Sequence, residues 1–293
     1  VSVLALAGAL VLRAQDFSHG TVDLRGVELD ARRTVALDGP WRFAWDRFVD
    51  PSTPDEALTD TIHVPEPWTH LNKEASFMRK ALGRGTYRLR LRLPEPGAPY
   101  ALKVPNIHTA YRMHVNGQLV AACGELGNDA RDAHPSSVPR VIGFVADSSG
   151  MAVINVQVSN HHFPTASGLW QPPRVGSLDA VSRDRSLGML LNGFLLGSLL
   201  IMGLYHIGLY VMRKRDRGPL LFAVACFSLG YRELFAGEVA AFSLVPWLDW
   251  HVAMRSLILM LPISMLAILF FIRDLFTSVF SRGMAIVVGV VAS

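Results

Sequence analysis

Tyr87-Arg88-Leu89-Arg90-Leu91-Arg92-Leu93 alternates strictly between apolar side chains and arginines. In an extended chain this period of two places the leucines on one face and the arginines on the other. The pattern predicts a β-strand with one face in a core and the other face solvated. Pro94 and Pro96 then end the strand, because proline cannot donate to a sheet ladder.

Other segments repeat this alternation and predict further strands, at residues 100–104, 111–115 and 152–158. Asn116-Gly117 follows the second of these, and Asn-Gly between alternating segments is a strong hairpin signal because both residues tolerate positive φ. Residues 118–122 are then the expected return strand. Short strands broken by Pro, Gly and Asn predict an antiparallel β-sandwich or barrel over residues 16–184. Trp41, Phe43 and Trp45 alternate and are expected to fill its core.

The second part of the sequence is apolar enough to lie in a lipid bilayer rather than in water. Residues 187–212 are apolar over a length that crosses a bilayer as a helix, and apolar stretches follow at 220–235, at 252–272 and from 283 onward. We therefore expect an α-helical transmembrane domain at 187–293 with about four spans, cut short at Ser293.

The first residues form an apolar run of the length found in signal peptides, Val1 to Ala14. Export with cleavage near Ala14 is the expected role, and a buried strand or helix of the first domain is the alternative. The basic residues agree with export. Arg213-Lys214-Arg215-Asp216-Arg217 predicts a cytoplasmic turn, whereas residues 237–251 contain no Lys or Arg and predict an outer loop. The β-domain then lies outside.

Several functional classes find little support in the sequence. The net charge is +4, but the arginines alternate along a strand or sit in the membrane turn, which argues against nucleic-acid binding. Cys123 falls in the expected water-soluble domain and Cys226 in an expected membrane segment, so the two cysteines are not expected to pair. The histidines match no standard metal motif, and no phosphate loop, nucleophile elbow or carboxylate pair is apparent. We expect no enzymatic activity, no cofactor and no metal.

Polar residues in the apolar segments are candidates for transmembrane coupling, since ionisable groups at membrane depth need a partner or water. They are Asn192, His206, Arg232 and Glu233. Gly193 and Gly197 lie four apart and allow close helix approach. That seam serves either packing within the bundle or a homodimer.

A ligand site is expected at one end of the sandwich, where aromatic faces stack on sugar rings and polar groups fix their orientation. The candidates are Trp68, His108, Arg112, Asn160, His161 and Trp170. The alternative for the tryptophans is a place in the core, and for the polar residues a solvated or capping role.

Two blocks of motifs are similar to one family. The first comprises Leu37–Phe43, Val64–Trp68, Gly85–Leu89, Pro105–Arg112, Val115–Gly117, Val158–Asn160 and Gly168–Trp170. It resembles the extracellular sensor domain of bacterial seven-transmembrane receptors with diverse intracellular signalling modules, a galactose-binding-like jelly roll akin to the sugar-binding module of family 2 glycosidases. The second block, Gly203–Tyr210 with the basic turn and Gly230–Leu234, resembles the first half of their membrane domain.

The resemblance implies a receptor in the bacterial inner membrane with a periplasmic or extracellular β-domain. A small, carbohydrate-like molecule and membrane lipid are the implied partners. Family members have seven spans and a cytoplasmic output, and this chain shows neither in full. A tethered carbohydrate-binding accessory protein and a transporter component are the competing hypotheses.

Overall fold

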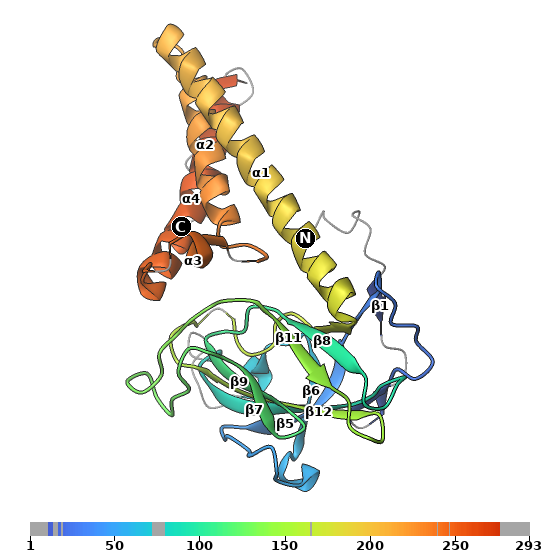
Figure 1. Cartoon of the computed structure of the whole chain (residues 1–293). Helices are drawn as coiled ribbons and strands as arrows, with labels where there is room; N and C mark the ends of the chain where they lie inside the picture. The colour runs from blue at the N-terminus through green and yellow to red at the C-terminus, as the bar shows by residue number, and fades with distance from the viewer. Residues whose placement is uncertain are drawn as a thin grey trace. The chain divides into compact units, whose positions relative to one another are not determined.

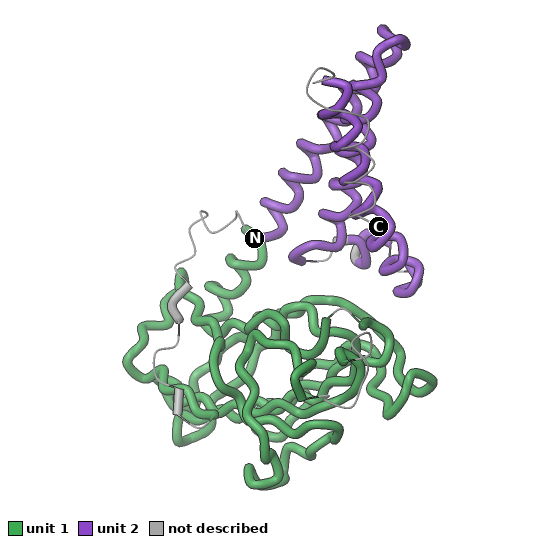
Figure 2. Tube along the Cα trace, turned by 180° about the vertical axis from the view of Figure 1, so that it is seen from behind, with its two compact units in different colours: residues 1–187 green, residues 188–293 purple. Residues whose placement is uncertain are grey.

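The computed structural model describes residues 11–13, 17–18, 20–71, 80–164, 166–238, 240–245 and 247–275. The chain forms two compact units, Val1–Leu187 and Gly188–Ser293 (Figure 2). Most of the expected signal segment, residues 1–10 and residue 14, lies outside the described residues. Val11–Arg13 is described and pairs as a strand. The expected fourth apolar span also lies outside the described residues.

Unit 1 is a β-sandwich of two sheets that share one core (Figure 1). The smaller sheet has the order β1-β4-β13-β8-β11. The larger runs β10-β9-β12-β7-β3-β2, with β5 also on β7 and β6 on β5. The strands are β1 (Val11–Arg13), β2 (Phe17–Ser18), β3 (Thr21–Asp23), β4 (Thr34–Ala36), β5 (Gly39–Trp45), β6 (Asp60–Val64), β7 (Gly83–Arg92), β8 (Pro99–Val104), β9 (Ala110–Val115), β10 (Gln118–Cys123), β11 (Arg140–Val145), β12 (Met151–Asn160) and β13 (Arg174–Gly176).

The strands expected from alternation are confirmed as β7, β8, β9, β10 and β12. The hairpin is confirmed too, because Asn116 and Gly117 both have positive φ, 49° and 80°, and join β9 to β10. Most strand pairs are antiparallel as expected. The pairs β1–β4 and β3–β7 are parallel, and both involve short strands near the N-terminus.

The core lies between the sheets. Trp41 and Phe43 are fully buried there as predicted, whereas Trp45 is half-buried. Two short 3₁₀ turns flank the core strands, η1 (Asp55–Ala57) and η2 (Trp68–His70). The loop that contains η1 crosses the outer face of the larger sheet.

Helix α1 (Leu178–Met212) begins nine residues before the apolar stretch expected at 187. Its start is fixed by Ser177, whose Oγ accepts a hydrogen bond from the Ala180 backbone N–H at 3.2 Å. The first turns belong to unit 1, where Val181 is fully buried. The sequence expectation missed these turns because they are amphipathic and dock on protein.

Asp184 links the first turns of α1 to the smaller sheet. Its two oxygens lie 3.0 Å from Lys103 Nζ on β8 and 2.9 Å from Arg174 Nη1 on β13. Lys103 and Arg174 are direct cross-strand neighbours, and like charges in that position repel. The Asp184 side chain is only 10% exposed, so its carboxylate neutralises both cations in a poorly solvated place.

Unit 2 contains the rest of α1, then α2 (Gly218–Glu233), α3 (Ala240–Leu244) and α4 (Trp250–Leu275). Among the described residues, α1 and α4 are long and apolar enough to cross a membrane. Their side chains are largely unburied, which fits contact with lipid rather than a soluble core. Helix α2 has 16 residues, roughly 24 Å at about 1.5 Å per residue, which falls short of a bilayer core of about 30 Å. The number of spans stays a prediction.

The Gly193–Gly197 seam on α1 is open in the described part of the chain. A Cβ added at either glycine would meet nothing within 4 Å. Packing within the bundle at this seam is therefore not seen among the described residues, and the homodimer stays a prediction.

Replacing Asp184 by Asn should destabilise unit 1 by about 1–3 kcal/mol, because Lys103 and Arg174 lose their shared counter-ion while facing each other. Asp179→Asn, at an exposed position five residues earlier on the same helix, is the matched control and should cost about 0.5 kcal/mol. Thermal unfolding followed by tryptophan fluorescence measures both. Equal losses would show that the Asp184 bridge contributes nothing.

Candidate functional site

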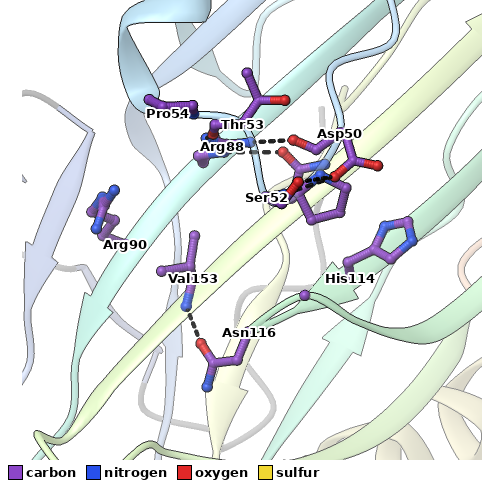
Figure 3. Close-up of a pocket in the computed structure, with 12 residues that line it drawn as sticks. Asp50, Ser52, Thr53, Pro54, Arg88, Arg90, His114, Asn116 and Val153 are labelled. Atoms are coloured by element: carbon purple, nitrogen blue, oxygen red, sulfur yellow. Dashed lines mark hydrogen bonds between the residues drawn. The ribbon is translucent and has the colours of Figure 1, made fainter.

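A polar cavity of about 520 Å³ opens on the outer face of the larger sheet (Figure 3). Strands β7, β9 and β12 form its floor, and the loop before η1 forms one wall. It is lined by Asp50, Pro51, Ser52, Thr53, Pro54, Arg88, Arg90, His114, Asn116, Gly117, Val153 and Asn155.

Strand register brings the floor residues together. Asn155 on β12 pairs with Arg88 on β7 and with His114 on β9, and Arg88 pairs in turn with Arg42 on β5. These residues form one polar row across four strands. Their neighbours along each strand point into the core, as the period of two requires.

Arg88 fixes the loop to the floor of the cavity. Its guanidinium donates to the Asn155 Oδ1 at 3.1 Å, to the Thr53 carbonyl at 2.5 Å and to the Asp50 carbonyl at 3.0 Å. The sequence predicted that the arginine face of this strand is solvated, which is wrong at Arg88. Its side chain is only 2% exposed because the loop covers it.

Asp55, in η1, is the counter-ion of this row. Its carboxylate lies 3.2 Å from Arg88, 2.8 Å from Arg90 and 3.5 Å from Arg42. Burial by itself would raise the pKa of Asp55, but hydrogen bonds from Arg90 and Arg88 outweigh it and lower this pKa below its usual value. The carboxylate is therefore ionised throughout the neutral range.

Asp50, Ser52 and His114 gather on the far side of the cavity from Arg90 (Figure 3). One Asp50 oxygen accepts hydrogen bonds from the Ser52 hydroxyl, at 2.6 Å, and from its backbone N–H, at 2.9 Å, and these bonds lower the pKa of Asp50. Burial lowers the pKa of His114 despite the nearby Asp50 carboxylate. The buried Nδ1 of His114 has no hydrogen-bond partner among the described residues.

The cavity thus offers carboxylate, amide, hydroxyl and guanidinium groups on a concave surface. This set suits a small ligand rich in hydroxyl groups, whose orientation several polar contacts would fix. Apart from His114, the lining contains no aromatic ring. Binding here therefore depends on hydrogen bonds and charge rather than on ring stacking.

The structure divides the six predicted ligand residues between two places. Arg112 lies on β9, two residues from His114 and on the same outer face, so it borders the cavity. The other five are not among the residues that line the cavity: Trp68, His108, Asn160, His161 and Trp170.

Trp68 and Asn160 are fully buried and hydrogen-bonded. Trp68 Nε1 donates to the Ala81 carbonyl, and Asn160 Nδ2 donates to the carbonyls of Ala81, Phe163 and Ala166. This leaves Trp68 no face for a ligand, and Asn160 serves to hold its loop.

His108 forms an aromatic stack with Phe163 and Trp170, at ring-centroid distances of 4.6 and 5.5 Å. Trp170 is partly exposed and donates its indole N–H to the Asn106 carbonyl. His161 contacts the Gly127 carbonyl through Nε2 at 3.2 Å. A ligand role for these three residues stays a prediction.

The loop residues Asp50, Ser52 and Asp55 were missed from the sequence. Their run, Asp50-Pro51-Ser52-Thr53-Pro54-Asp55, has the composition of an ordinary surface loop. The usable signal was the arginine row of β7, because nearby carboxylates would relieve the repulsion between like charges on one strand face.

The predicted membrane-coupling residues each have a local partner and do not form one cluster. Asn192 donates to the Ala236 carbonyl at 3.1 Å. His206 contacts the Met202 carbonyl through Nδ1, and its ring packs 4.3 Å from Phe222 on α2. Arg232 lies 3.8 Å from the carboxylate of Glu233. Their role in coupling stays a prediction.

Asp55→Asn should destabilise unit 1 by about 2–3 kcal/mol, because it removes the carboxylate that lies 3.2 Å from the buried guanidinium of Arg88. The control is Asp46→Asn, whose carboxylate is 65% exposed where it pairs with Arg84, and it should cost no more than about 1 kcal/mol. Urea unfolding of both variants would contradict this account if the two losses were equal.

Unit 1 should also lose stability as the pH falls from about 6.5 towards 4. Burial lowers the pKa of His108, which is 6% exposed, from 6.5 to about 4, so the unfolded chain binds the proton more tightly. Stability is complete above pH 6.5 and declines by roughly 3 kcal/mol as pH approaches 4.

His108→Gln should flatten this pH slope, whereas His134→Gln, at an exposed position, should leave it unchanged. Urea midpoints measured from pH 7.5 to 4 give the slopes. A His108→Gln protein with the original slope would rule out His108 as the titrating group.

Solved structures with some likeness to this chain are glycosidases. A β-glucuronidase from Faecalibacterium prausnitzii has 16% identity and a TM-score of 0.36, covering 48% of this chain and 31% of its own. A family 2 glycosyl hydrolase from Bacteroides cellulosilyticus has 18% identity and a TM-score of 0.38, covering 49% and 20%. A family 2 β-galacturonidase from Eisenbergiella tayi has 14% identity and a TM-score of 0.34, covering 50% and 24%. The chain thus spans less than a third of each, and these TM-scores carry no inference about ligand or activity.

No curated protein matches the chain. The family comparison gives a match to the second unit, over residues 188–293, with the family described as 7TM diverse intracellular signalling. This is the family whose membrane motifs the sequence resembles, and its members are membrane sensors rather than enzymes. Residues 188–293 thus match the 7TM diverse intracellular signalling family, which the membrane motifs of the sequence resemble.

Proposed function

We propose that this chain is the sensing part of a bacterial inner-membrane receptor, and that its β-sandwich binds a small polyhydroxylated ligand, of carbohydrate type, outside the cytoplasm. The observation that carries the proposal is the polar cavity of about 520 Å³ in unit 1, on a chain whose residues 188–293 match a family of membrane receptors. The ligand contacts would come from the loop at Asp50–Pro54 and from His114, with Arg112 at the border.

Charge distribution supports the proposed orientation. The turn between α1 and α2 carries Arg213, Lys214, Arg215 and Arg217, which are all exposed. Cationic turns remain preferentially on the cytoplasmic side, so the start of α1 would lie on the opposite side with the sandwich.

The link between sandwich and membrane helix supports the proposed relay. Helix α1 begins within unit 1, where Asp184 binds both Lys103 and Arg174, and the same helix continues into the apolar span. A ligand transmits a signal only if it binds two arrangements of the receptor with different affinity. We propose that the Asp184 bridge is one of the contacts that differs between them.

A saccharide that binds the cavity should raise the thermal midpoint of the full chain in lipid nanodiscs, because a ligand of the folded state stabilises it by about 2.7 kcal/mol at 100 times its Kd. His114→Ala should weaken that ligand about tenfold, since it removes one polar wall group. His134→Ala, at an exposed position outside the cavity lining, is the control and should bind normally.

A panel of neutral and acidic monosaccharides and disaccharides provides the probes. Binding that is weakened by His114→Ala and not by His134→Ala supports the proposal. Absence of binding by every saccharide to a folded chain, or binding that survives His114→Ala unchanged, contradicts it.

A further inference from the structure

Arg90 presents an unused guanidinium edge to the cavity. Its Nε donates to Asp55 at 2.8 Å, and neither of its Nη groups has a hydrogen-bond partner among the described residues. The side chain lines the cavity and is 40% exposed. Two adjacent N–H groups in a planar fork match the two oxygens of a carboxylate.

Asp55 orients Arg90 for this role. The carboxylate fixes Nε, and hydrogen bonding to Asp55 raises the pKa of Arg90, so the guanidinium is always charged. Asp55 does not neutralise this charge fully, because the same carboxylate also serves Arg88 and Arg42. Asp55 thus lies near three guanidinium groups at this end of the cavity, and the charge of Glu56 also acts on Arg90.

The opposite end of the cavity offers hydrogen-bond acceptors instead of a cationic donor. Asp50 and His114 stand across from Arg90 (Figure 3), and only one Asp50 oxygen is engaged by Ser52. This end accepts hydrogen bonds from hydroxyl groups. A ligand that fits both ends therefore has an acidic group at one end and hydroxyl groups at the other.

The border of the cavity adds positive charge. Arg112 lies on the same face beside His114 and forms no ion pair within the described part of the chain. Its charge favours the approach of an anion over that of a neutral molecule.

We infer that the ligand is an acidic saccharide, a sugar of the uronic acid class, whose carboxylate binds the Nη edge of Arg90 while its hydroxyl groups face Asp50 and His114. This inference rests on the proposed function and narrows its ligand class. Arg90 would then determine the preference for an acidic group, and Asp55 would orient the Arg90 side chain.

The test compares three probes of nearly equal size with the full chain in lipid nanodiscs by isothermal titration calorimetry. Glucuronate carries the carboxylate, glucuronamide replaces it by a neutral amide, and glucose lacks the group. We expect glucuronate to bind at least about tenfold more tightly than glucuronamide, as a charge-assisted hydrogen bond predicts. Its affinity should fall from 50 to 500 mM salt, whereas glucose binding should not.

Variants of the arginines separate specificity from folding. Arg90→Gln should remove the preference for glucuronate over glucuronamide, and Arg90→Lys should restore part of it by retaining the charge. Arg84→Gln is the matched control, because Arg84 lies on the same strand and face, where it pairs with Asp46. Thermal midpoints confirm that each variant is folded.

The outcomes distinguish this inference from the proposed function. Equal binding of glucuronate and glucuronamide, weakened by His114→Ala, overturns the acidic ligand and leaves the sugar sensor intact. A preference that survives Arg90→Gln, or that Arg84→Gln also removes, overturns the role of Arg90. No binding by any of the three probes or by the wider saccharide panel overturns both.

Discussion

One carboxylate held between two cross-strand cations is the interaction on which the sandwich and its cavity depend. Arg42 and Arg88 face each other on β5 and β7, and Asp55 reaches over from the loop to contact both. Without that carboxylate, like charges would repel across the sheet, and the loop would lose its attachment to the floor. The cavity exists because the loop is held at this point.

A carboxylate also bridges two cross-strand cations on the smaller sheet, where it attaches a helix instead of a loop. Lys103 and Arg174 are cross-strand neighbours, and Asp184 of α1 bridges them. In both places the cations come from the sheet and the anion from an element that covers it. Each covering element is therefore positioned by charge as well as by apolar packing, and each contact responds to a change in local charge.

Much of the fold was accessible from the sequence, because burial on one face of a strand imposes a period of two. Residues 87–93 and Asn116-Gly117 therefore predicted β7 and the β9–β10 hairpin correctly. The first turns of α1 were not predicted, since their apolar face covers protein and is too narrow to stand out. Helix α2 has the length of the apolar stretch expected at 220–235, and its position differs by two residues.

The candidate site was harder to predict from the sequence than the fold was. The alternation of apolar and polar residues predicts the polar face that forms the floor of the cavity. It does not indicate which loop covers that face. Arg88 was therefore expected in solvent, although the loop at Asp50–Asp55 buries it. Trp68 was a candidate ligand residue with a place in the core as its alternative, and it is fully buried. Long-range loop placement depends on tertiary contacts that one sequence does not reveal.

Hydrogen–deuterium exchange of the full chain in nanodiscs, with and without saturating glucuronate, tests the central claim most directly. If the cavity on the outer face is the sensing site, glucuronate will slow exchange in the loop at Asp50–Asp55 and in the β9–β10 turn at Asn116. Protection confined to residues 160–170 around His108 and Trp170, or unchanged exchange in the loop despite bound sugar, would contradict the account.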